Sequence, residues 1–226
     1  MNIESFSDHD ALADAAAATL AEALAGPGAR SFVATGGTTP GPTYDRLSRR
    51  DLDWSRLTVT LSDERWVDPS APESNEGLVR RRLLTGHAAR AGFLALKGDG
   101  ATPEADAAAA ESGLEALAPF AAVLLGMGSD GHIASLFPGA PGLEAALDPQ
   151  GANWCVGVDQ AGLDPRVPRI SLTARALLSS ALVLILITGK EKRRVVERVA
   201  ADLRFVPPVA TMLRQTRVPV RVFWAA

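Results

Sequence analysis

The segment Leu182–Lys190, LVLILITGK, indicates the fold class of this protein. Its first six residues are all apolar, which is typical of a central strand in a parallel sheet that helices cover on both faces. A membrane span would need about 20 apolar residues, so this run is too short for one. The residues that follow, KEKRRVVERVAAD (190–202), favour a helix. The segment therefore predicts a buried strand that leads directly into a helix.

Strand and helix patterns alternate along the rest of the chain. Strands are predicted at SFVATGG (31–37), RLTVTLSDERW (56–66), GFLALKG (92–98), FAAVLLG (120–126), NWCVGV (153–158) and VPVRVFW (218–224). Helices are predicted at 8–26, 42–50, 74–84, 102–119, 190–202 and 207–215, whereas RISLTARALLSSA (169–181) is ambiguous. Strands joined by helices of about ten or more residues form parallel β-α-β units. We therefore expect one α/β domain over residues 1–226, with a mostly parallel sheet and helices on both faces.

Composition narrows the class of function. The 226 residues carry a net charge of −3, so no basic field favours a nucleic acid as partner. The single cysteine, Cys155, leaves no internal disulfide and argues against a structural zinc site. The N-terminal segment begins acidic and lacks the pattern of a signal peptide. We expect a cytoplasmic protein without membrane or nucleic-acid partners.

Four polar segments come directly after predicted strands. They are TGGTTP (35–40), SDER (62–65), GMGSDGH (126–132) and TGK (188–190). Ligands of such sheets bind outside the carboxyl ends of the strands, so all four segments can face one crevice.

The first of these segments has the residues of an anion-binding turn. Gly36 and Gly37 allow backbone N–H groups to approach an anion, and Thr38 and Thr39 add hydroxyl donors. Pro40 then opens a helix, whose first turn carries partial positive charge. The alternative is an ordinary β–α turn. The segment is not a P-loop, because no Gly-Lys-Ser/Thr follows.

Charged residues at two strand ends are further candidates. Burial of Asp63, Glu64 and Arg65 would require partners, and Arg65 suits a phosphate or carboxylate; the alternative is a solvated strand end. Lys190 opens a helix, where a lysine opposes the helix dipole unless an anion is present. Arg169 is a less specific candidate.

We expect the basic residues after Lys190 to form a solvated helix face. They are Lys192, Arg193 and Arg194.

The third segment contains Gly126, Gly128 and Gly131, which match G-x-G-x-x-G. A dinucleotide site also requires a helix that starts at the third glycine and an acid about 20 residues later at the end of a strand. Here FPG (137–139) interrupts any helix, and the acids at that distance lie in GLEAALDPQG (142–151), which is not a strand pattern. The context argues against dinucleotide binding.

His132 offers a different chemistry in the same segment. A near-neutral imidazole suits a general base, and Asp130 lies two residues away, where a carboxylate can orient the ring. The alternative is a structural loop histidine. Ser135 lies in no G-x-S-x-G elbow and Cys155 has no evident base, which argues against a nucleophile. His132 lacks a second histidine at ligand spacing, which argues against a metal.

In order and spacing, these motifs resemble those of the 6-phosphogluconolactonase family. The resemblance rests on TGGTTP, LSDERWV…SN, GMGSDGHIASLFPG, RISL and TGKEKR, and covers most of the chain from about Ala34. It implies a modified Rossmann-like sheet, shared with glucosamine-6-phosphate deaminases and ribose-5-phosphate isomerases. The implied reaction is hydrolysis of 6-phospho-D-glucono-1,5-lactone to 6-phospho-D-gluconate, in the oxidative pentose phosphate pathway. We expect no cofactor, and a monomer or weak homo-oligomer.

The resemblance also implies roles for individual residues. His132 is the expected base, and Asp130 or Asp63 orients the imidazole or holds sugar hydroxyls. The expected phosphate-binding residues are Gly36, Gly37, Thr38, Thr39, Arg65, Arg169 and Lys190. Phe137 stands where similar deaminases carry the glutamate of an Asn-Glu-Pro pattern, which favours the lactonase over a deaminase or isomerase. A non-catalytic sugar-phosphate sensor is the other alternative, and the intact pair of Asp130 and His132 argues against it.

Overall fold

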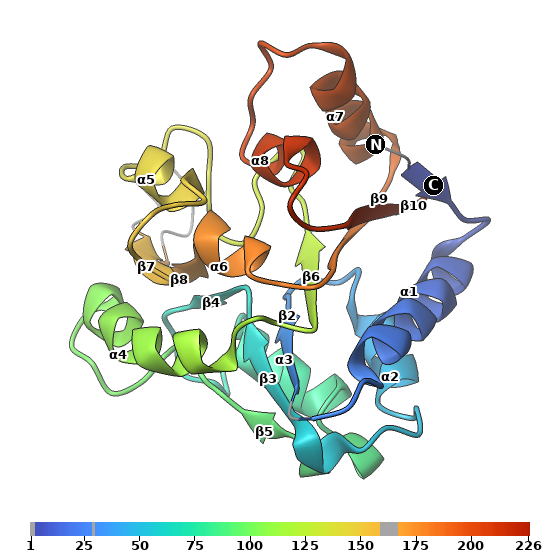
Figure 1. Cartoon of the computed structure of the whole chain (residues 1–226), viewed down its shortest axis with the longest axis vertical. Helices are drawn as coiled ribbons and strands as arrows, with labels where there is room; N and C mark the ends of the chain where they lie inside the picture. The colour runs from blue at the N-terminus through green and yellow to red at the C-terminus, as the bar shows by residue number, and fades with distance from the viewer. Residues whose placement is uncertain (1–2, 29, 159–166) are drawn as a thin grey trace.

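The structure is a computed structural model that describes residues 3–28, 30–158 and 167–226. Seven strands form a parallel sheet in the order β1-β10-β9-β6-β2-β3-β5 (Figure 1). They are β1 (Ile3–Ser5), β2 (Arg30–Ala34), β3 (Leu57–Leu61), β5 (Gly92–Phe93), β6 (Ala122–Gly126), β9 (Val183–Thr188) and β10 (Val220–Ala225). The predicted parallel α/β fold is confirmed.

The central strands are buried on both faces. All residues from Val183 to Ile187 in β9 are buried, and so are residues 122–125 in β6. Side chains of a strand alternate between its two faces, so a strand that is buried throughout must be covered on both. Figure 1 shows α1 (His9–Leu24) and α2 (Gly41–Leu47) on one side of β2 and β3, and α4 (Pro103–Leu117) on the other.

The order of the strands reverses between β2 and β6. From β2 the chain adds β3 and β5 on one side, and it then crosses to add β6, β9 and β10 on the other. The loops that leave β2 and β6 therefore turn in opposite directions, and a crevice opens between them at the carboxyl ends of the strands.

A second, antiparallel sheet stands beside this crevice. Its strands are β4 (Asp63–Arg65), β8 (Arg169–Leu172) and β7 (Cys155–Val158). The prediction of one strand over 56–66 is wrong, because the strand breaks at Ser62. Ser62 donates its N–H to the carbonyl of Ala34 (2.7 Å) and accepts from the N–H of Leu172 (2.8 Å). One residue thus joins the two sheets and redirects the chain.

Capping side chains precede four of the α-helices, namely α1, α3 (Asn75–Arg82), α4 and α6 (Ala174–Leu178). The Asp8 carboxylate accepts the N–H of Ala11 at the start of α1 (2.8 Å), and the Thr102 hydroxyl accepts that of Ala105 in α4 (3.2 Å). The remaining α-helices are α5 (Leu143–Leu147), α7 (Lys190–Ala201) and α8 (Val209–Arg214), with 3-10 turns at Trp54–Arg56 and Gly86–Arg90.

Other short elements also differ from prediction. The ambiguous segment 169–181 divides into β8 and α6, and the strand predicted at 92–98 shrinks to the two residues of β5. β1 and α5 have no counterpart in the predictions. β1 is only three residues long and exists because it pairs with β10, which local sequence patterns do not report.

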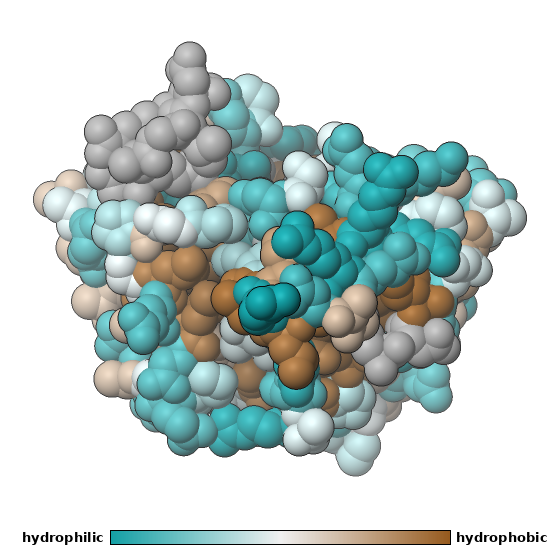
Figure 2. Space-filling view, turned by 90° about the horizontal axis from the view of Figure 1, so that it is seen from above, coloured by the Kyte–Doolittle hydropathy of each residue, from teal (hydrophilic) through white to brown (hydrophobic). Residues whose placement is uncertain are grey.

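Apolar burial is concentrated in one cluster around the parallel sheet. In the view from above, hydrophilic residues cover much of the surface and hydrophobic ones show between them (Figure 2). Leu203 and Val206, in the connection from α7 to α8, are exposed hydrophobic side chains. No helix within the described ranges is long and apolar enough to cross a membrane.

Candidate active site

A cavity of about 260 Å³ lies where the strand order reverses, between the loops that follow β2 and β6. Residues of β4, α3, β8, β9 and α7 complete its wall. The lining residues are Thr35, Gly36, Gly37, Thr38, Thr39, Pro40, Asp63, Arg65, Asn75, Gly126, Met127, Gly128, His132, Ala134, Leu186, Arg169 and Lys192. The structure thus brings together three of the four polar segments, whereas residues 188–190 lie outside the lining.

His132 is held by Asp130 within the loop that follows β6. The Asp130 Oδ1 accepts the backbone N–H of His132 at 3.0 Å and lies 2.7 Å from its Nδ1. A carboxylate can only accept, so Nδ1 carries a proton, and in the neutral imidazole Nε2 then presents a lone pair. No described residue hydrogen-bonds to Nε2. The imidazole is therefore arranged to accept a proton from a molecule in the cavity.

The glycines of this loop serve the His132–Asp130 geometry. The loop closes through the Gly128 N–H, which donates to the His132 carbonyl at 2.9 Å. A Cβ at Gly128 would overlap the ring of His132, and one at Gly131 would lie 2.6 Å from Pro207. Gly131 also has φ of +82°, which favours glycine. No helix starts at Gly131, so the feature that a dinucleotide site requires is absent.

An aromatic ring packs against the outer part of the same loop. The rings of His132 and Phe137 lie 4.4 Å apart between centroids, and the Arg169 guanidinium lies 5.5 Å from the Phe137 ring. Ala134 lies between His132 and Phe137 in the sequence and has φ of +48°. It is the one described residue other than glycine with a positive φ. Phe137 is thus an aromatic contact for the histidine.

Asp63 supports the loop, and among the described contacts it makes no hydrogen bond to His132. Its Oδ2 accepts the Ser135 hydroxyl at 2.6 Å, and its Oδ1 accepts the Ser62 hydroxyl at 3.0 Å. The Arg169 Nη1 lies 3.9 Å from Oδ2. Of the two acids proposed to orient the imidazole, Asp130 occupies that place, and Asp63 connects β4 to the loop.

Two arginines lie close together at the β4–β8 side of the cavity. Arg65 donates through Nη1 to the Asn75 side-chain oxygen, and the residues Arg65 and Arg169 pair across the two strands. Burial lowers the pKa of Arg169, and the charge of Arg65 lowers it further. The buried Nε of Arg169 has no hydrogen-bond partner among the described residues. An anion bound here would relieve the repulsion between the two cations.

Lys192, not Lys190, reaches the cavity from α7. Lys190 is exposed at the first position of the helix and lies outside the lining, contrary to the role expected for it. Lys192 is half-buried and lines the cavity, so its assignment to a solvated face is wrong. Burial lowers the pKa of Lys192, while the charge of Asp130 opposes that change. Residues two apart on a helix point in nearly opposite directions, which explains the difference.

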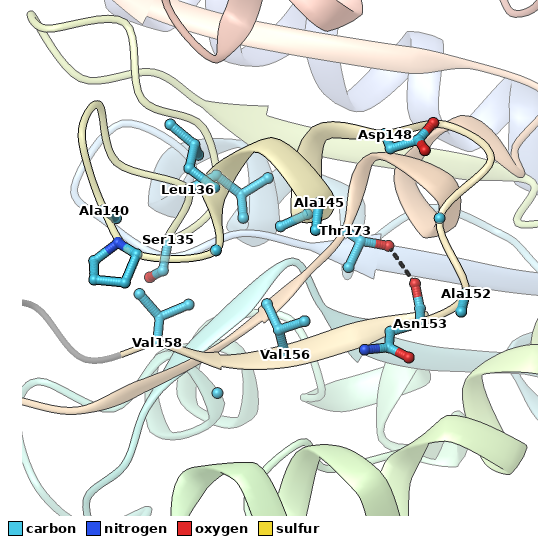
Figure 3. Close-up of a pocket in the computed structure, with 16 residues that line it drawn as sticks. Ser135, Leu136, Ala140, Ala145, Asp148, Ala152, Asn153, Val156, Val158 and Thr173 are labelled. Atoms are coloured by element: carbon cyan, nitrogen blue, oxygen red, sulfur yellow. Dashed lines mark hydrogen bonds between the residues drawn. The ribbon is translucent and has the colours of Figure 1, made fainter.

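A second cavity, of about 370 Å³, has Ser135 among its lining residues (Figure 3). Apolar side chains such as Leu136, Val156 and Val158 line much of it. The Thr173 hydroxyl donates a hydrogen bond to the Asn153 carbonyl at 2.7 Å. Asp148 is the one titratable side chain among its described lining residues. It lacks a base and a cluster of cations, so we place the chemistry in the first cavity.

Asn75 lines the cavity but was not among the site residues predicted from the sequence. Its position in SN (74–75) indicated only the start of a helix. In the structure its side chain donates to the Asp63 carbonyl at 2.7 Å and accepts from Arg65. The segment LSDERWV…SN had contained the signal, but spacing alone does not show that Asn75 turns back onto Arg65.

Comparisons with known proteins identify the family of this chain. Residues 7–224 match the family described as "Glucosamine-6-phosphate isomerases/6-phosphogluconolactonase". A 6-phosphogluconolactonase of Caulobacter vibrioides is 44% identical, covering 100% of this chain and 97% of the relative; one of Pseudomonas aeruginosa is 43% identical, covering 94% and 88%. The crystal structure of a 6-phosphogluconolactonase from Shewanella baltica has a TM-score of 0.92 at 37% identity, covering 99% of this chain and 97% of that one.

Similarity of the fold, without close similarity of sequence, extends to a deaminase. A monomeric glucosamine-6-phosphate deaminase has a TM-score of 0.79 at 20% identity, covering 99% of this chain and 97% of that one. The family match spans nearly the whole chain, and the identities above lie well beyond those of a shared fold. The chain belongs to the glucosamine-6-phosphate isomerase/6-phosphogluconolactonase family.

Proposed function

We propose that this protein hydrolyses 6-phospho-D-glucono-1,5-lactone to 6-phospho-D-gluconate, with His132 as general base. The observation that carries the proposal is the His132–Asp130 pair at a cavity that also holds Arg65, Arg169 and Lys192. A base beside an excess of positive charge suits a substrate with an activated ester at one end and a phosphate at the other. Relatives at 43–44% identity carry the name of this activity.

The reaction starts with proton transfer to Nε2 of His132. Nε2 takes a proton from water while the water oxygen attacks C1 of the lactone. The former carbonyl oxygen then carries the negative charge of a tetrahedral intermediate. When the intermediate collapses, the bond from C1 to the ring oxygen breaks, and the imidazolium returns the proton to that oxygen. The new carboxylic acid releases its own proton to solvent, and the histidine is neutral again.

Charges around this step fit its demands. The Asp130 carboxylate lies 2.7 Å from Nδ1 and stabilises the imidazolium that forms when Nε2 takes up the proton. Lys192 lines the cavity and experiences the charge of Asp130, so we place it at the reacting end, where its ammonium can stabilise the oxyanion. Nothing in this sequence of steps requires a covalent intermediate.

The phosphate then belongs at the two arginines. Arg65 and Arg169 supply positive charge in close proximity, and Thr38 and Thr39 line the same cavity with hydroxyl donors. Gly37, with φ of +94°, turns the backbone of that loop. A phosphate dianion needs several donors as well as charge, and this wall of the cavity offers both.

A deaminase is the enzymatic alternative, and Phe137 opposes it. The ring lies against His132 and Arg169 and offers no acid for opening a sugar ring. The discriminating experiment supplies the protein with fresh 6-phosphogluconolactone, followed by acid release, and with glucosamine 6-phosphate, followed by ammonia release. We expect acceleration with the lactone alone. Ammonia release would favour the deaminase, and binding of 6-phosphogluconate without turnover would favour a sensor.

A further inference from the structure

The carboxylate of Glu64 is buried directly behind the arginine side of the cavity. Glu64 is 1% exposed and is not among the lining residues. Its Oε1 accepts the backbone N–H groups of Arg65 (2.7 Å) and Asn75 (2.8 Å). Its Oε2 accepts the N–H of Glu76 (2.7 Å) and the hydroxyl of Ser74 (3.0 Å). One side chain thus fixes the backbone of β4 to the start of α3.

These contacts occupy the positive end of α3. The Ser74 hydroxyl accepts the N–H of Gly77 at 3.0 Å, so it caps the helix while donating to Glu64. The first N–H groups of the helix already serve the Glu64 carboxylate. The end of α3 is therefore not available to a substrate anion.

Asn75 carries the effect of Glu64 into the cavity. Its side-chain N–H donates to the Asp63 carbonyl at 2.7 Å, and its oxygen accepts from Arg65 Nη1. A Cβ at Gly36 would overlap this oxygen, so the loop after β2 packs directly on it. The position of Asn75 consequently sets both the direction of the Arg65 guanidinium and the shape of the opposite loop.

We infer that Glu64 is a positioning residue that holds Arg65, through Asn75, in the orientation that binds the substrate phosphate. The inference rests on the proposed function, because it assigns a phosphate to this side of the cavity. Among the described residues Glu64 has no ion pair; its four hydrogen-bond donors are three backbone N–H groups and a hydroxyl. A glutamine cannot replace it, because the amide nitrogen would face N–H donors.

The test compares Glu64→Gln with Glu76→Gln. Glu76 is also a buried acid of the first turn of α3, but its carboxylate pairs with Arg80 Nε at 2.8 Å and not with the cavity. Calorimetry should show that the Kd for 6-phosphogluconate is about tenfold or more higher in Glu64→Gln than in the wild type, because hydrogen bonds to a charged group are disturbed. In Glu76→Gln the Kd should rise less than about twofold. KM for the lactone should follow Kd, while kcat stays within about threefold.

A double-mutant cycle with Arg65→Met separates positioning from general damage. If Glu64 acts through Arg65, Glu64→Gln should raise Kd less than about twofold once Arg65 is gone. An equal rise in both backgrounds, or a loss confined to kcat, would overturn the inference. If Glu64→Gln does not fold, Ser74→Ala replaces it in the cycle, with an expected rise of about threefold that is absent from the Arg65→Met background.

Binding and turnover keep the two proposals apart. A wild-type protein that does not hydrolyse the lactone would refute the proposed function. The Kd cycle with 6-phosphogluconate would still decide the role of Glu64, since it needs no turnover.

Discussion

Replacing Asp130 by asparagine measures what the carboxylate contributes to the reaction. Its Oδ1 lies 2.7 Å from Nδ1 of His132, and the two side chains are 49% and 31% exposed. Two unit charges about 4 Å apart attract by ~1 kcal/mol in water and ~4 kcal/mol at an effective dielectric constant near 20. The pair is partly exposed, so an intermediate value of about 2 kcal/mol applies to the imidazolium in the transition state. Asp130→Asn should therefore lower kcat about 30-fold.

The assay is acid release at saturating lactone, with KM from the same data. We expect KM to change less than about threefold, because an interaction made only in the transition state affects kcat. The control is the same substitution in a His132→Ala background, where it should cost less than about twofold because its partner is missing. An unchanged kcat in Asp130→Asn, or the full loss in the absence of His132, would refute the reasoning.

Three further outcomes are expected. Lys192→Met should lower kcat/KM about 10- to 100-fold, since it removes a charged donor, whereas Lys190→Met should leave it within about twofold; equal effects in steady-state assays would contradict the placement. Gly36→Ala should raise KM about 5- to 100-fold, because its Cβ overlaps the Asn75 side chain, and an unchanged KM would show that the loop can move. Arg221 lowers the pKa of Glu4, so this pair stabilises the fold above the ordinary pKa of glutamate and the effect is lost as pH falls through the lowered value. Urea unfolding of Glu4→Gln should show at most about 1 kcal/mol of destabilisation at neutral pH and none in strong acid, because the pair is more than a third exposed.

The sheet was predictable because burial on both faces leaves a local signature. Continuous apolar runs such as 183–187 identify central strands, and Gly, Pro and Ser at the element ends identify turns and caps. The three-residue strands β1 and β4 were not predictable as separate elements, because they depend on pairing with β10 and β8. Short strands of this kind are fixed by tertiary contacts and not by propensity.

The site was predictable at its loops and less so at its side chains. His132, Asp63 and Arg65 each follow a predicted strand, and all three line one cavity. This agrees with the rule that ligands bind at the carboxyl ends of parallel strands. Which lysine of α7 enters depends on the rotation of the helix about its axis, so Lys192 was missed and Lys190 chosen. The buried hydrogen-bond network around Glu64 joins β4 to α3, so it could be predicted only from the relative placement of these two elements.

Hydrolysis of 6-phosphogluconolactone by the wild type and by His132→Ala tests the central claim most directly. Calorimetry with 6-phosphogluconate first establishes that the variant is folded and binds. Loss of a general base typically costs about 10²–10⁴ in rate, so we expect clear acceleration by the wild type and a loss of that size in a variant that still binds. Equal rates for the two proteins would contradict His132 as the base, and no acceleration by the wild type would contradict the proposed lactonase activity.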